Sequence, residues 1–176
     1  MRDTSLEEGK RFGLDDIRDL IDLYIDMLKE HYKDRLISIA IFGSTVRGEA
    51  RTDSDIDMLI VVEGLSEDIG ERVREVSSIK FRLKEFKSYW EGYREGKPRL
   101  ISEVILTPEE VSRHPPILLD IAHEGVILYD EDRFLEGELE KVRRKLEELG
   151  ARRVKGKAGW YWILKPDAKL GEVIKI

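Results

Sequence analysis

The sequence predicts an α/β or α+β fold in which a small sheet is backed by helices. Three observations lead to this expectation. Two short apolar runs, residues 36–42 and 56–62, have the β-branched and continuous character of buried strands. Segments with apolar residues at helical spacing precede and follow them. The chain has 176 residues, of which 41% are hydrophobic and 39% charged, so it can form one domain with a buried core and a small appendage.

The first half of the chain alternates between these two kinds of segment. Residues 14–34 predict an amphipathic helix, because apolar residues recur at helical spacing between acids: Leu14, Ile17, Ile21, Tyr24, Leu28 and Tyr32. The strands at 36–42 and 56–62 follow, joined by a polar linker. Residues 66–95 are highly charged and contain no proline, which predicts one helix with Ser66 as its N-cap.

The second half continues the alternation. It predicts, in order, a strand at 99–106, a helix start at 107–111, a short helix at 115–125, a short strand at 126–130 and an amphipathic helix at 131–150. Residues 151–176 contain aromatic and turn residues without a helical period. We therefore expect a core over residues 1–130 and, over residues 131–176, a C-terminal helix with a short, basic and aromatic β extension.

The charge is distributed unevenly along the chain. Residues 1–140 contain 20 basic and 33 acidic side chains, whereas residues 141–176 contain 11 basic and 4 acidic ones. The main body should repel bulk nucleic acid, and the basic end is suited to an anionic partner. The alternative is that these charges pair within the fold.

Composition also limits the compartment and the chemistry. The absence of cysteine excludes disulfides, thiol nucleophiles and cysteine-based zinc sites, and it fits a reducing cytoplasm. Residues 1–16 lack the apolar core of a signal peptide, and no stretch has the roughly 18 apolar residues of a membrane span. We expect a soluble, cytoplasmic protein.

The linker between the first two strands carries the residues of greatest chemical interest. Asp55 and Asp57 are two apart on a strand, so their side chains leave the same face about 6.5–7 Å apart. Two carboxylates without nearby histidine or cysteine favour a hard cation such as Mg²⁺. Gly43 allows the backbone amide and the Ser44 hydroxyl to approach a phosphate, and Arg47 adds a forked cationic donor. The pattern predicts a site for Mg²⁺ and a nucleoside triphosphate.

The alternative is a polar connection whose aspartates only cap or solvate the turn. The position of Asp57 inside an otherwise apolar strand disfavours that interpretation, because an unpartnered carboxylate there would be costly.

These residues also carry a resemblance. Gly43-Ser44, ten intervening residues and Asp55-x-Asp57, with an apolar strand on each side, resemble the signature of the polymerase-β-type nucleotidyltransferase superfamily, and Arg47-Gly48 matches a less fixed part of it. The segment is most similar to the minimal nucleotidyltransferases of bacteria and archaea, some of which are antitoxins that transfer AMP to a partner protein. The resemblance implies a mixed sheet backed by helices, two Mg²⁺ ions, ATP as donor, and nucleotidyl transfer to a hydroxyl with pyrophosphate leaving.

The family has a third carboxylate on a later strand, where it usually places an aspartate. Glu103 is the only acid within a later apolar strand here. The resemblance therefore implies that Glu103 joins Asp55 and Asp57 as a catalytic residue and metal ligand, acting as general base or in metal-assisted activation of the acceptor hydroxyl. The alternative is a glutamate on a solvent-facing edge.

Other candidates are weaker. The three histidines, His31, His114 and His123, share no metal-ligand spacing and are expected in packing or surface roles. The aromatic residues at 160–162 suit stacking on a base or an RNA end, or packing over the C-terminal helix.

Three functions remain open at this point. The first is Mg²⁺-dependent transfer of a nucleoside monophosphate, most simply AMP from ATP, to a hydroxyl that belongs to a partner protein, a small molecule or an RNA end. The second is an inactive nucleotide- or partner-binding module of the antitoxin type. The third is RNA binding by the basic C-terminal segment.

Overall fold

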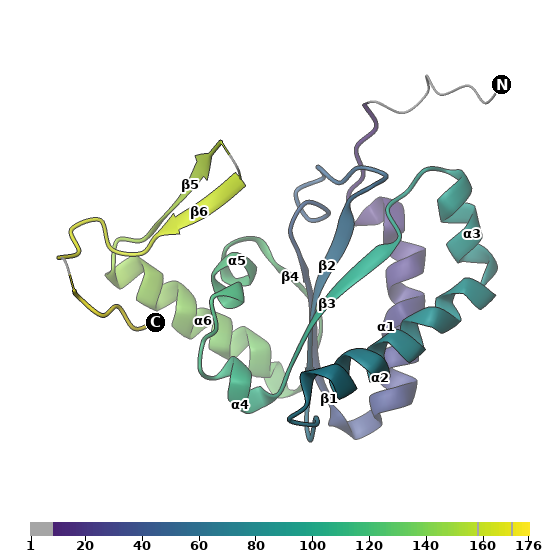
Figure 1. The fold of residues 1–176 in the computed structure, drawn as a ribbon, viewed down its shortest axis with the longest axis horizontal. Coiled ribbons are helices and arrows are strands. Elements are labelled where there is room, and N and C mark those ends of the chain that lie inside the picture. The colour runs from purple at the N-terminus through teal and green to yellow at the C-terminus, as the bar shows by residue number, and fades with distance from the viewer. Residues whose placement is uncertain (1–8, 158, 170) are drawn as a thin grey trace.

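A four-stranded mixed sheet lies between two layers of helices (Figure 1). The computed structural model describes residues 9–157, 159–169 and 171–176, so half of the N-terminal segment discussed above lies outside the described residues. The strands, in spatial order, are β3 (Leu100–Leu106), β2 (Asp55–Val62), β1 (Leu36–Phe42) and β4 (Val126–Asp130). β2 and β3 are parallel, and the other two pairs are antiparallel. The expected mixed sheet is confirmed.

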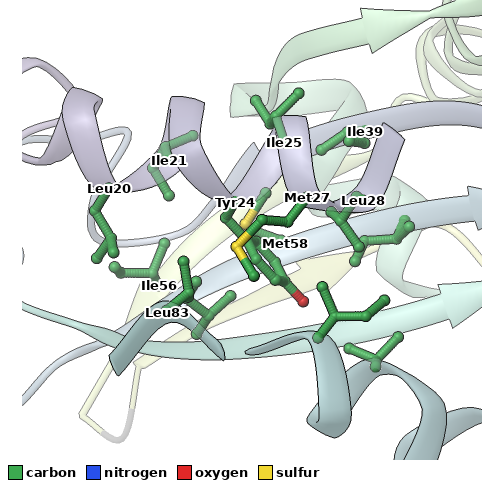
Figure 2. Close-up of a cluster of buried hydrophobic side chains, with 14 of the residues drawn as sticks. Leu20, Ile21, Tyr24, Ile25, Met27, Leu28, Ile39, Ile56, Met58 and Leu83 are labelled. Atoms are coloured by element: carbon green, nitrogen blue, oxygen red, sulfur yellow. The ribbon is translucent and has the colours of Figure 1, made fainter. Parts of the chain in front are cut away.

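Three helices cover the first face of the sheet: α1 (Arg18–Tyr32), α2 (Ile69–Arg82) and α3 (Lys87–Arg94). The apolar spacing predicted for α1 faces the strands, and Ile21, Tyr24 and Leu28 are fully buried. Figure 2 shows Tyr24 lying over Met58 of β2, with Leu83 nearby. Alternate residues of β1 and β2 complete this cluster, as the two-residue period of a strand requires.

The second face is covered by α4 (Pro108–Val111), α5 (Ile117–Glu124) and α6 (Phe134–Glu148). The other set of alternate strand residues, including Leu59 and Val61, packs here against Leu135 and Leu139 of α6. The division of the chain after residue 130 stays a prediction, but α6 shares one hydrophobic cluster with the central strands.

The prediction of one helix over residues 66–95 is wrong. α2 begins after Asp68, whose side chain caps the helix by accepting a hydrogen bond of 2.7 Å from the Gly70 amide. A short 3-10 turn (Leu83–Glu85) and an extended residue, Phe86, then separate α2 from α3. The break changes the direction of the chain. As a result, Leu83 of the turn and Tyr89 of α3 both reach the core.

The C-terminal segment forms a hairpin. β5 (Arg152–Gly156) pairs antiparallel with β6 (Gly159–Ile163), apart from the four-stranded sheet (Figure 1). Further 3-10 turns occupy Asp15–Ile17, Lys33–Arg35 and Glu131–Arg133. Within the described part of the chain, no helix has the length and apolar character needed to cross a membrane.

Candidate active site

Asp55 and Asp57 lie at the start of β2, on the same face of the sheet. Leu59 and Val61 follow on the same face of β2 and are buried under α5 and α6. Asp55 is exposed and Asp57 is half-buried. The start of β2 therefore extends past the helical cover, and it presents two carboxylates at the rim of the core.

The turn after β1 presses against one of these carboxylates. Gly43 has a φ of +78°, and a Cβ placed there would lie 2.4 Å from Oδ2 of Asp57. Only glycine accepts both the left-handed backbone and this close approach. The amide of Arg47 donates to the Gly43 carbonyl at 3.3 Å, and the amide of Glu49 to the Ser44 carbonyl at 2.9 Å, so the turn is tightly wound. The structure brings the glycine-serine turn and Asp57 together, as the sequence predicts.

Arg47 is held by two carboxylates beside this turn. Its Nε donates to Glu49 at 2.8 Å, and its guanidinium also donates to Glu124 at the end of α5. Only 25% of the side chain is exposed. These two contacts fix the orientation of the guanidinium beside the turn.

The electrostatics of the aspartate pair favour a bound cation. Burial raises the pKa of Asp57, and the charge of Asp55 raises it further, while Arg47 acts in the opposite direction. Two carboxylates with this mutual repulsion fit Mg²⁺, which binds proteins through one or two carboxylates and takes its other ligands from phosphates and water. Among the described residues, no group of three histidine, aspartate or glutamate side chains forms a metal cage.

The structure does not bring Glu103 to Asp55 and Asp57, contrary to the expectation that it joins them as a metal ligand. In the parallel pairing of β2 with β3, Glu103 lies opposite Met58, and Asp57 lies opposite Ser102. Paired residues point to the same face, so Glu103 projects into the cluster beneath α1 and α2.

Glu103 accepts two hydrogen bonds on that opposite face. It accepts hydrogen bonds from the Tyr24 hydroxyl at 2.7 Å and from Nζ of Lys80 at 2.6 Å, and only 6% of its side chain is exposed. The solvent-facing alternative therefore fails as well. Burial raises the pKa of Tyr24, and the charge of Glu103 adds to the shift, so the phenol stays a hydrogen-bond donor.

Replacement Glu103→Gln is expected to lower stability while leaving unchanged the nucleotidyl transfer that the sequence predicts. The loss should be about 1–3 kcal/mol, because Lys80 loses its charged partner in a partly buried place. Urea unfolding and pyrophosphate release measure the two effects. The matched control is Glu30→Gln, which removes an exposed pair with Arg82 and should change stability by less than about 0.5 kcal/mol. A large loss of transfer rate in a folded Glu103→Gln protein would contradict this assignment.

The remaining candidates are occupied in surface and packing contacts. His31 lies 2.9 Å from Glu75, and His114 lies 2.8 Å from Glu138. The ring of His123 packs edge-on against Trp162 with their centroids 5.6 Å apart.

Two residues next to the site have no signal in the sequence. Glu124 contacts both Arg47 and Arg153 of β5, and the Arg153 side chain is only 9% exposed. Glu124 is one of 37 acids in the chain, and only the tertiary fold brings it to the two arginines.

The sequence is similar to those of known nucleotidyltransferases. Residues 21–95 match the family described as the nucleotidyltransferase domain. A protein of Methanocaldococcus jannaschii named "Putative protein adenylyltransferase MJ1305" is 30% identical over 135 residues, which span 76% of this chain and 85% of that protein.

Solved structures are similar at lower identity. Spectinomycin adenyltransferase AAD(9) from Enterococcus faecialis, with ATP and spectinomycin, is 18% identical with a TM-score of 0.47, covering 75% of this chain and 66% of that one. A toxin-antitoxin complex with AMP-PNP is 14% identical with a TM-score of 0.40, covering 73% and 92%.

Proposed function

Because the chain belongs to the nucleotidyltransferase domain family, we propose that it transfers AMP from Mg²⁺-ATP to a hydroxyl group of a protein acceptor. The observation that carries the proposal is the approach of the Gly43 turn to the Asp57 carboxylate. It supports a site in which a phosphate-binding backbone and a metal-binding carboxylate face the same ligand.

Each residue has one task in this proposal. Asp55 and Asp57 hold Mg²⁺ through their carboxylate oxygens. The amides of the turn and the hydroxyl of Ser44 donate to phosphate oxygens, and Arg47 offsets the phosphate charge. When bound, Mg²⁺ stabilises negative charge on the phosphates and lowers the pKa of the attacking hydroxyl.

The reaction that these residues assist is a single displacement. The acceptor oxygen forms a bond to the α-phosphorus, the bond from that phosphorus to the bridging oxygen breaks, and pyrophosphate leaves with the electron pair. The hydroxyl proton is released. A protein acceptor is supported by the relative that is 30% identical, whose name describes a protein adenylyltransferase.

The decisive experiment uses ATP labelled at two positions. The protein is incubated in host extract with Mg²⁺ and either α-labelled or γ-labelled ATP. We expect a labelled protein band with the α label alone, together with release of pyrophosphate. Labelling by the γ label would indicate phosphoryl transfer instead, and Mg²⁺-dependent thermal stabilisation by ATP without any transfer would indicate an inactive nucleotide-binding module.

A further inference from the structure

The C-terminal hairpin has two different faces. Arg153 is paired with Trp162 and Lys155 with Trp160, so these four side chains project from one face of the β5–β6 ribbon. Two cations and two indole rings thus share a surface, and they belong to the basic part of an acidic chain.

The inner end of this face is anchored next to the candidate active site. The indole of Trp162 donates to Asp120 at 3.1 Å, and Arg153 donates to Glu124 through both terminal nitrogens. Glu124 also accepts from Arg47, so one carboxylate joins the hairpin to the phosphate-binding turn. Charge-assisted bonds between side chains as buried as Glu124 (11% exposed) and Arg153 (9% exposed) are strong and directional, which fixes the hairpin relative to Arg47.

The outer end of the same face is open. Trp160 is 44% exposed, and its ring centroid lies 5.1 Å from the guanidinium carbon of Arg153 and 5.5 Å from Nζ of Lys155. The pKa of Glu49 is lowered mainly by its hydrogen bond with Arg47, and the positive charge of Lys155 lowers it further. In Figure 1 the hairpin and the connection between β1 and β2 both lie on the upper side of the view. This face of the hairpin is therefore linked to Arg47 through Glu124 and to Glu49 through the charge of Lys155.

The charges on this surface identify the partner. Within the described residues, no carboxylate forms a salt bridge with Lys155, whereas Arg153 on the same face pairs with Glu124 and Asp120. A lysine without an ion pair, beside an exposed indole, favours acidic and aromatic side chains. Nucleic acid is a less suitable partner. Two strands of five residues carry few cations to contact successive phosphates, and the acidic body of the protein repels nucleic acid.

We propose that Lys155 and Trp160 form a docking surface for an acidic segment of the protein acceptor, next to the site of AMP transfer. This inference rests on the proposed function for the identity of the partner. The shared Glu124 keeps the docking surface and Arg47 in a fixed relation, so a docked segment presents its hydroxyl to the same place in each encounter.

The test measures binding without nucleotide, so that it is independent of catalysis. The probe is a fluorescent peptide of glutamate and tyrosine, compared with a peptide of lysine and tyrosine and with oligoadenylate RNA of equal net charge. We expect the acidic peptide to bind best, and Lys155→Glu to weaken its binding about tenfold through charge reversal. Trp160→Ala should also weaken it. The matched control Arg144→Glu makes the same charge change at an exposed position on α6 and should bind as the wild type does.

Several results would overturn the docking surface. They are no binding of the acidic peptide to the wild type, equal binding by Lys155→Glu and wild type, an equal loss in Arg144→Glu, or tighter binding of the RNA. A protein that binds the acidic peptide through Lys155 but never transfers AMP keeps the docking surface and refutes only the proposed function.

Discussion

Replacement of Asp57 by asparagine is expected to abolish AMP transfer while the fold stays intact. In the proposed site the carboxamide would lack the charge that holds Mg²⁺, and loss of several kcal/mol of transition-state stabilisation corresponds to a rate at least about 10³-fold lower. Pyrophosphate release measures the rate. The stabilisation of the protein by Mg²⁺-ATP, read from Tm, should disappear with it.

Without ligand, the Asp57→Asn protein should be at least as stable as the wild type. The pKa of Asp57 is raised in the folded state, first by burial and then by Asp55, so the ionised carboxylate disfavours folding. Below the ordinary pKa of a carboxyl group, Asp57 is protonated in both states and takes nothing from the free energy of unfolding. That free energy falls as the pH rises through the raised pKa of the folded state. Asparagine removes this loss, so at neutral pH we expect a gain of up to about 1 kcal/mol, which vanishes at low pH.

Asp53→Asn is the matched control for this experiment. Asp53 is in the same linker, with its side chain 81% exposed and 3.7 Å from Arg51, and its replacement should leave transfer and Tm near wild type. Wild-type turnover in Asp57→Asn, or an equal loss in Asp53→Asn, would refute the metal-binding role of Asp57.

Replacement of Gly43 by alanine is the second large effect that we expect. The new methyl group would lie 2.4 Å from Oδ2 of Asp57, so the carboxylate must move. A displacement of this size at a catalytic group typically costs about 10²-fold in rate. The left-handed backbone adds a stability cost of about 1–2 kcal/mol.

Gly48→Ala separates these two causes. Gly48 also has a left-handed backbone, with a φ of +67°, but a Cβ there meets no atom within 4 Å. Both variants should lose similar backbone stability in urea unfolding, while only Gly43→Ala should lose transfer and the response of Tm to Mg²⁺-ATP. Equal transfer rates in the two variants would show that the contact between Gly43 and Asp57 has no catalytic importance.

The central strands were predictable because their sequence signal is local. The run at 36–42 coincides with β1, and 56–62 differs from β2 by one residue, since continuous β-branched runs bounded by polar residues leave little choice. The break between α2 and α3 was not predictable. Residues 83–86 contain neither glycine nor proline, and packing of Leu83 and Tyr89 decides the change of direction.

The position of Glu103 depended on a register that the sequence does not specify. A shift of one residue in a parallel strand moves every side chain to the other face. The spacing of Ile101, Glu103 and Ile105 puts the glutamate on the same face of the strand as two isoleucines. The structure shows which face that is, because Ile101 is buried beneath the helices of the first layer. The contacts of Glu124 lie outside any local pattern, because its partners are 77 and 29 residues away.

The arrangement of the second hydrophobic cluster has a consequence for synthesis of the protein. The strand residues of that cluster, among them Ala40, Phe42 and Leu59, are made early, but the helix that covers them spans Phe134–Glu148. Translation runs from the N-terminus, so this apolar stripe leaves the ribosome long before its cover. The nascent chain can bury this stripe only after residues 134–148 have been synthesised. Until then the stripe is an exposed apolar surface of the kind that favours association between nascent chains.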